Sequence, residues 1–206
     1  MNIGVGMHKD DLQIDPDMLM RGLKDGLSGG KTLMSDEQAR QEISELRQQM
    51  MAKMQAKQQQ ESEENKKKGD AFLAENKTKP GVVALPSGLQ YKILKEGTGP
   101  KPTATDSVKC NYKGTLVNGT EFDASEKHGG PATFPVTGVI KGWTEALQLM
   151  PVGSKWQLFI PPDLGYGARG AGGDIGPNET LIFEVELLSI EKPKEPAAPA
   201  TPPPSK

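Results

Sequence analysis

The stretch that decides the fold reads NYKGTLVNGTEFDAS and covers residues 111–125. Near its start Tyr112 stands between two polar residues, which is the alternation of a β-strand with one buried face. Asn118-Gly119 is a strong signal for a two-residue hairpin turn. After the turn come Phe122 and Asp123, an aromatic side chain followed directly by a carboxylate. The stretch therefore predicts an antiparallel hairpin that carries aromatic residues and one acid close to a turn.

The rest of the chain from about residue 80 to residue 191 continues this pattern. Apolar and polar residues alternate at 89–93, 108–113, 156–160 and 181–187, which predicts further strands. Between them, residues 142–150 predict one short helix, and Pro151 closes it because proline cannot continue a helix. One helix packed across a curved antiparallel sheet is an α+β domain.

The usual signals of hydrolytic, metal or cofactor chemistry do not occur in the sequence. His8 and His128 lie far apart, the single cysteine forms no ligand cluster, and no phosphate loop, dinucleotide fingerprint or nucleophile elbow is found. We therefore expect no metal and no cofactor. What remains is a concentration of aromatic and apolar residues near loops, and taken singly each is best read as a core residue.

Four segments in order resemble the FKBP-type peptidyl-prolyl cis/trans isomerases. The hairpin quoted above resembles the family's Tyr-x-Gly strand and Phe-Asp corner, and residues 139–143 (VIKGW) resemble its Val-Ile-x-Gly-Trp helix start. Residues 160–167 (IPPDLGYG) resemble its loop ending in Tyr-Gly, and residues 177–187 (PNETLIFEVEL) resemble its final strand. The resemblance implies a five-stranded antiparallel sheet wrapped on one short helix, and a prolyl isomerase activity.

The resemblance also implies a pocket between sheet and helix, with Trp143 as its floor. The residues placed at the reacting amide are Asp123, Tyr112 and Tyr166, and those that bind substrate are Phe122, Val139, Ile140, Trp143, Ile175 and Phe183. Asp123 is expected either to interact with the twisted carbonyl or to orient Tyr112, and the sequence leaves both roles open. The chain departs from the family at Pro131-Ala132, where many members carry another aromatic residue, and His128 stands where a basic side chain often occurs.

Two helices are expected ahead of this domain. Asp15-Pro16 reads as an N-cap followed by a first helical residue, and Leu19, Leu23 and Leu27 then recur on one face. Ser35 and Gln38 have the spacing of a capping box for a long second helix. Its residues 57–68 are wholly polar, so we expect either a free-standing helix that packs on no core or a disordered linker.

This N-terminal order resembles the macrophage infectivity potentiator subgroup of the family. The resemblance implies an all-α N-terminal dimerisation segment (1–35), a long connecting helix (36–79), the isomerase domain (80–191) and a disordered Pro/Ala-rich tail (192–206). It further implies a V-shaped homodimer, a bacterial protein that is periplasmic or associated with the outer membrane, and residues missing upstream of Met1. A cytoplasmic location is the alternative. The uncovered leucine faces independently favour a second copy as partner.

The expected partners are proline-containing peptides and unfolded or folding proteins, with rapamycin-type macrolides as possible inhibitors. A net charge of −2 argues against nucleic acid, and no apolar run is long enough to cross a bilayer. Two competing interpretations are a non-catalytic chaperone or prolyl-peptide-binding module, and a plain coiled-coil scaffold. The scaffold leaves the C-terminal half unexplained.

Overall fold

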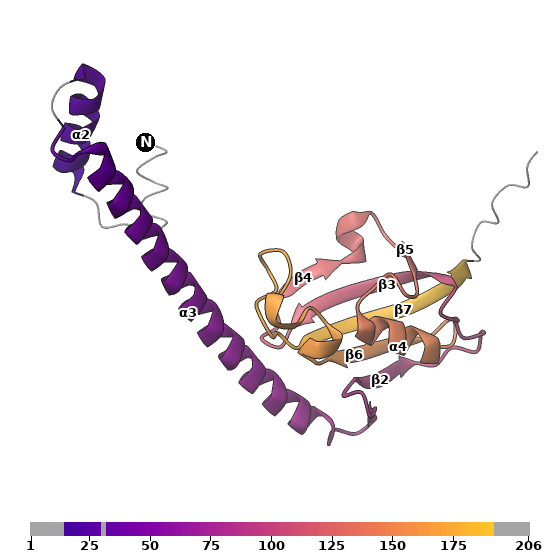
Figure 1. The fold of residues 1–206 in the computed structure, drawn as a ribbon. Helices are drawn as coiled ribbons and strands as arrows, with labels where there is room; N and C mark the ends of the chain where they lie inside the picture. Colours follow the sequence, from indigo (N-terminus) through magenta and orange to yellow (C-terminus); the bar gives the residue numbers. More distant parts are fainter. Residues whose placement is uncertain (1–14, 30–31, 192–206) are drawn as a thin grey trace, which may run out of the picture. The chain divides into compact units, whose positions relative to one another are not determined.

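The computed structural model describes residues 15–29 and 32–191, which form two compact units that divide between residues 55 and 56 (Figure 1). The expectations for Met1–Met7 and for the tail at 192–206 lie outside the described residues. The division falls well inside the expected connecting helix rather than at its end near residue 79. The last part of that helix therefore belongs to the C-terminal unit.

The N-terminal unit begins with helix α2 (Pro16–Ser28). Its predicted cap is confirmed, because the Asp15 carboxylate accepts hydrogen bonds from the backbone N–H groups of Asp17 at 2.8 Å and Met18 at 3.2 Å. Gly29 ends the helix in the left-handed conformation, with φ at 63°. No residue of α2 is buried within the chain.

Helix α3 (Asp36–Asn76) begins with the predicted capping box. The Ser35 hydroxyl accepts from the Gln38 N–H at 3.2 Å, and the Gln38 side chain accepts from the Ser35 N–H at 2.9 Å. The polar residues 57–68 are helical. None of the helices among the described residues is long and apolar enough to cross a membrane.

The C-terminal unit is built on one antiparallel sheet, and the described residues contribute seven strands to it. They are β1 (Val82–Ala84), β2 (Gln90–Lys95), β3 (Ser107–Leu116), β4 (Glu121–Ala124), β5 (Ala132–Pro135), β6 (Lys155–Ile160) and β7 (Leu181–Glu191). Their order is β1-β2-β6-β7-β3-β4, and β5 pairs with β3. The α+β class is confirmed, and the strands beyond the predicted five include the short β1 and β5.

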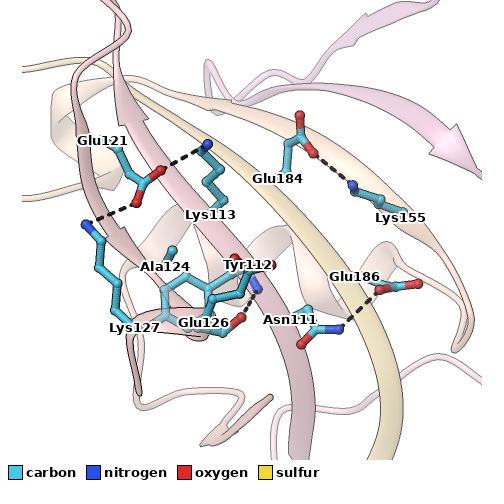
Figure 2. A pocket seen from close by; sticks show the side chains of 11 residues that line it. Asn111, Tyr112, Lys113, Glu121, Ala124, Glu126, Lys127, Lys155, Glu184 and Glu186 are labelled. Atoms are coloured by element: carbon cyan, nitrogen blue, oxygen red, sulfur yellow. Dashed lines mark hydrogen bonds and ion pairs between the residues drawn. The ribbon is translucent and has the colours of Figure 1, made fainter. Parts of the chain in front are cut away.

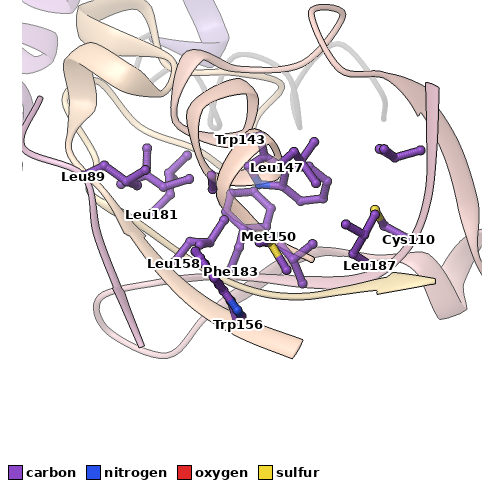
Figure 3. Packing of buried hydrophobic residues seen from close by; sticks show 14 of the residues in the cluster. Leu89, Cys110, Trp143, Leu147, Met150, Trp156, Leu158, Leu181, Phe183 and Leu187 are labelled. Carbon is purple, nitrogen blue, oxygen red and sulfur yellow. The ribbon is translucent and has the colours of Figure 1, made fainter. Parts of the chain in front are cut away.

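The core lies between one face of this sheet and helix α4 (Lys141–Leu149) (Figures 1 and 3). Buried apolar residues alternate along β3, β6 and β7, as predicted, and Trp143 and Leu147 meet them from α4. Strand β2 departs from the pattern, because Ile93 is exposed and Gln90 is buried. Apolar burial of this kind is the main force that holds helix to sheet.

The last turns of α3 cover part of the opposite face of the sheet. The rings of Phe72 and Phe159 are 5.9 Å apart, and the Asn76 amide donates to the Gln90 side chain at 3.0 Å. Further up the helix, Ser62 and Asn65 make hydrogen bonds to the loop before β7. The expectation of a free-standing helix over residues 57–68 is therefore wrong at Ser62 and Asn65, which contact a loop of the domain rather than its core. Polar side chains make this contact, and apolar periodicity does not detect them.

The hairpin between β3 and β4 differs in detail from its prediction. The Leu116 N–H donates to the Thr120 carbonyl at 2.8 Å, which leaves three residues in the loop rather than two. A two-residue turn of type I′ needs positive φ at both central positions. Gly119 has a φ of 86°, but Asn118 does not have a positive φ. Asn178 is the one non-glycine residue with positive φ in the described part of the chain.

Candidate active site

An open pocket of about 620 Å³ lies at the N-terminal end of α4, and its lining includes every residue that the sequence predicted for the site. The lining combines those nine residues with five others: Tyr112, Phe122, Asp123, Phe134, Gly138, Val139, Ile140, Trp143, Tyr166, Ala171, Gly172, Asp174, Ile175 and Phe183. These residues come from strands β3, β4, β5 and β7, from α4 and from two loops. The fold thus brings segments together that are far apart in the sequence.

Trp143 forms the floor of the pocket, since it is buried and surrounded by rings on three sides. Its ring centre lies 5.5 Å from that of Tyr112, 5.8 Å from Phe134 and 5.2 Å from Phe183, each nearly edge to face. These contacts fix the plane of the indole. Within the described structure the indole nitrogen has no hydrogen-bond partner. The floor is therefore an aromatic surface held in place by its neighbouring rings.

Phe134 is the lining aromatic that sequence reasoning missed. It comes from β5, two residues after Pro131-Ala132, where the expected aromatic was absent. Its ring contacts both Tyr112 and Trp143, at 5.8 Å each. The pocket thus keeps an aromatic wall on this side, supplied from a neighbouring position. Phe134 is brought to the pocket by the pairing of β5 with β3, in which it lies opposite Val108. The sequence alone does not show this pairing.

Asp123 is the carboxylate of the pocket, and protein groups occupy both of its oxygens. One oxygen accepts from the Tyr112 hydroxyl at 2.9 Å, and the other accepts from the Ala124 N–H at 2.9 Å and lies 2.8 Å from His128 Nε2. Partial burial raises the pKa of Asp123, but the hydrogen bonds from His128, Tyr112 and Ala124 together outweigh it and the pKa is lowered. Asp123 is therefore ionised at neutral pH. Because a carboxylate only accepts, His128 Nε2 must carry the proton.

The two tyrosines of the pocket differ in their surroundings. Burial, followed by the hydrogen bond to Asp123, raises the pKa of Tyr112 to about 12. Tyr166 is 40% exposed, and its pKa is also raised, by burial first and then by the charge on Asp123. Both hydroxyls are therefore neutral hydrogen-bond donors at neutral pH. Tyr112 donates within the protein, whereas Tyr166 lies at the opening.

The loop at residues 170–178 closes one side of the pocket with Ala171, Gly172, Asp174 and Ile175. Ala171 and Ile175 exchange two backbone hydrogen bonds, of 2.9 and 3.1 Å, which makes the loop a closed turn. Gly170 enters this turn with φ at 64° and ψ at −163°, a conformation open to glycine almost alone.

A second hollow, of about 370 Å³, lies over β3, β4, β6 and β7 and has a different character (Figure 2). Its walls are ion pairs. Lys113 and Lys127 both reach Glu121 at 3.0 Å, and Lys155 reaches Glu184 at 2.9 Å. With three lysines and four glutamates among its eleven lining residues, this hollow is mainly charged. This hollow fits a solvated outer face of the sheet, whereas the pocket at Trp143 fits an apolar ligand.

Family models match nearly the whole chain. Residues 99–188 match the family described as FKBP-type peptidyl-prolyl cis-trans isomerase, and residues 1–93 match the domain amino terminal to it. The outer membrane protein MIP of Legionella longbeachae is 53% identical, over 93% of this chain and 82% of that protein. The chain belongs to the FKBP-type peptidyl-prolyl cis-trans isomerases. It is a peptidyl-prolyl cis-trans isomerase of the bacterial Mip-like subgroup, as its N-terminal order predicted.

Further relatives support the same conclusion. The peptidyl-prolyl cis-trans isomerase Mip of Coxiella burnetii is 49% identical, over 92% of this chain and 82% of that protein. Among solved structures, FkpA from Escherichia coli has a TM-score of 0.77 at 36% identity, covering 93% of this chain and 89% of that chain. An isomerase from Pseudomonas syringae has a TM-score of 0.60 at 45% identity, covering 64% of this chain and 96% of that chain.

Proposed function

We propose that the pocket around Trp143 is the active site of this isomerase. The observation that carries the proposal is the convergence of all nine sequence-predicted residues on one apolar hollow of about 620 Å³. Pockets that bind small groups are concave and mostly apolar, with a few polar groups that fix orientation. A prolyl ring has the size and character to rest on the Trp143 indole.

The chemistry needs no nucleophile, because no bond is made or broken. Resonance holds the X-Pro amide planar, behind a barrier of roughly 18–20 kcal/mol. When the C–N bond twists, resonance is lost and the carbonyl becomes less polar. A dry, aromatic pocket therefore favours the twisted amide over the planar one, which lowers the barrier. The Tyr166 hydroxyl and the Ile140 N–H supply donors to the substrate backbone.

We assign Asp123 the role of orienting Tyr112 rather than that of contacting the carbonyl. The Tyr112 hydroxyl bonds one of its oxygens, and the Ala124 N–H and His128 approach the other. Hydrogen bonds to charged groups are roughly twice as strong as neutral ones, so this arrangement holds the Tyr112 ring against Trp143. The two roles that the sequence left open are separable by experiment.

Asp123→Ala is expected to lower kcat/KM of the full chain by about tenfold or more, because a charge-assisted hydrogen bond contributes roughly 1.5–3 kcal/mol. Tyr112→Phe is expected to lose a similar amount. If Asp123 acts through Tyr112, the double variant loses no more than either single one. A protease-free isomerisation assay on a prolyl tetrapeptide measures all three.

Asp163→Ala is the matched control, since Asp163 is an exposed carboxylate outside the pocket lining. Wild-type rates in Asp123→Ala and Tyr112→Phe would rule out the proposed active site. Additive losses in the double variant would instead assign Asp123 a direct role at the carbonyl.

The proposed substrates are exposed proline-containing segments of unfolded or folding proteins, since the pocket is open to solvent and has an aromatic floor on which a prolyl ring can rest. Macrolides of the rapamycin type are proposed as competitors for the same floor. We place the protein in the periplasm or at the outer membrane, which is supported by the name of its Legionella longbeachae relative.

We further propose that the chain is a homodimer joined through the N-terminal unit, with the isomerase domain at 80–191 as its catalytic part. Leu19, Leu23 and Leu27 on α2 are 46%, 57% and 80% exposed. A helix of this length with no buried face is not stable alone in water. A second copy of the same helix is the simplest cover, because closed symmetric dimers are the commonest assembly.

Light scattering coupled to size exclusion is expected to give twice the chain mass at micromolar concentration. Replacing Leu19 and Leu23 by glutamate is expected to give the monomer mass with prolyl-tetrapeptide activity retained, because neither residue lines the pocket. Gln41→Glu, on the exposed part of α3, is the charge control. A monomer mass for the unaltered chain would refute the dimer.

A further inference from the structure

Five residues of α3 form one stripe along the helix, at positions 62, 65, 69, 72 and 76. The spacings of three and four place them on one face. The stripe is Ser, Asn, Gly, Phe and Asn, so only one member is a large apolar residue. Within the C-terminal unit this face lies against the domain that carries the pocket.

The polar end holds the loop that closes the pocket. The Asn65 side-chain amide donates to the Pro177 carbonyl at 3.0 Å, and the Asn178 amide donates to the Ser62 hydroxyl at 2.7 Å. Asn65 also approaches Gly176 so closely that a Cβ there would lie 3.1 Å from its nitrogen. Pro177 and Asn178 come directly after Ile175 and Gly176 at the end of the loop.

The anchored end of the loop is also the end with an unusual backbone. Asn178 has φ of 53°, a conformation that non-glycine residues rarely adopt. Its N–H donates to the Gly167 carbonyl at 2.9 Å, which ties it to the turn after Tyr166. Ile175, which lines the pocket, is thus close to Pro177 and Asn178, which contact α3 directly. Tyr166, which also lines the pocket, is next to Gly167, which Asn178 holds through its N–H. Such a conformation persists when its surroundings fix it.

Gly69 allows this close approach. A Cβ at Gly69 would collide with the Thr180 hydroxyl, so only glycine lets the helix backbone lie against the start of β7. Thr180 is buried, and its hydroxyl has no hydrogen-bond partner among the described residues. The contact between Gly69 and Thr180 is therefore close van der Waals packing and not a hydrogen bond. It sets the depth at which Asn65 and Ser62 meet the loop.

We infer that Asn65 and Ser62 are positioning residues of the isomerase: they hold loop 170–178 against the pocket and so determine how tightly the segment around the substrate proline binds. This inference rests on the proposed assignment of the pocket as the active site. It gives the polar part of α3 a role in substrate binding. The loop carries Asp174 and Ile175, one acidic and one apolar side chain, and both line the pocket.

The test uses the full chain with Asn65→Ala, Ser62→Ala, and the isosteric Asn65→Asp, which replaces the amide donor with an acceptor facing the Pro177 carbonyl. Each alanine variant is expected to raise KM for a prolyl tetrapeptide by about three- to tenfold with kcat little changed, since one partly buried hydrogen bond is lost. Asn65→Asp is expected to raise KM at least as much. Amide hydrogen exchange at residues 170–176 should accelerate by a similar factor, while β3 and β7 keep their protection.

Alanine is a better helix former than asparagine or serine, so a weakened helix cannot cause the expected loss. Lys67→Ala is the control on the same helix, because Lys67 is exposed and lies two residues from Asn65, on the opposite side. Unchanged KM in the Asn65 and Ser62 variants, while Asp123→Ala loses activity, overturns this inference alone. Unchanged activity in the Asp123 and Tyr112 variants as well overturns the pocket assignment.

Discussion

Trp143→Ala is expected to lower the free energy of unfolding by about 3–5 kcal/mol and kcat/KM by more than tenfold. Trp143 is only 4% exposed, and three aromatic rings contact it within 5.2 to 5.8 Å. Removing it leaves a cavity that the rigid sheet cannot fill, and it takes away the surface on which the prolyl ring rests. Urea unfolding followed by circular dichroism measures the first effect, and the tetrapeptide assay in buffer measures the second.

Trp156→Ala is the matched control for this prediction. Trp156 is equally buried and stacks on Tyr91 with ring centres 4.2 Å apart, but it does not line the pocket. It should lose comparable stability and keep its activity per folded molecule. Trp143→Phe, which retains an aromatic floor, covers the case in which the alanine variant does not fold. Equal losses of activity per folded molecule in Trp143→Ala and in Trp156→Ala would contradict a special role for Trp143.

Local chemistry made the helix ends of this chain predictable. A cap needs one side chain within reach of a backbone N–H two or three residues away, and the Asp15 and Ser35 caps are both present as predicted. Strand alternation was equally informative where one face of the sheet is buried. Phe159 is an exception, because it is an apolar residue on the outer face of the sheet, where α3 covers it. The sequences of the neighbouring strands do not indicate this contact.

The pocket was predictable only through motif resemblance. Tyr112, Phe122, Trp143 and Phe183 lie on four different elements, β3, β4, α4 and β7, and no spacing within any one element shows that their rings meet. Phe134 was missed because β5 is a four-residue strand whose position is fixed by its pairing with β3. The contacts of Ser62 and Asn65 were missed for a different reason, since both read as ordinary exposed helix residues until the loop at 170–178 is in place.

Gly114→Val is expected to destabilise the protein by about 1–3 kcal/mol and to lower kcat/KM about tenfold, because it forces apart two rings of the pocket. Gly114 lies near the C-terminal end of β3, paired with Asp123 on β4 and Phe183 on β7. A Cβ there would stand 2.6 Å from the Phe122 ring and 2.8 Å from the Phe183 ring. Those rings are themselves 5.4 Å apart, edge to face, so neither yields without moving the other.

Valine suits a β-strand better than glycine does, so strand propensity opposes the expected loss. Any destabilisation then reports the collision with the rings. Gly114→Ala should give a smaller loss in the same direction, and Thr115→Val, next to it on the other face of β3, should give almost none. Urea midpoints and tetrapeptide kinetics on the three variants supply the series. If Gly114→Val is as stable and as active as the unaltered chain, Phe122 and Phe183 do not form the fixed wall that the active-site proposal requires.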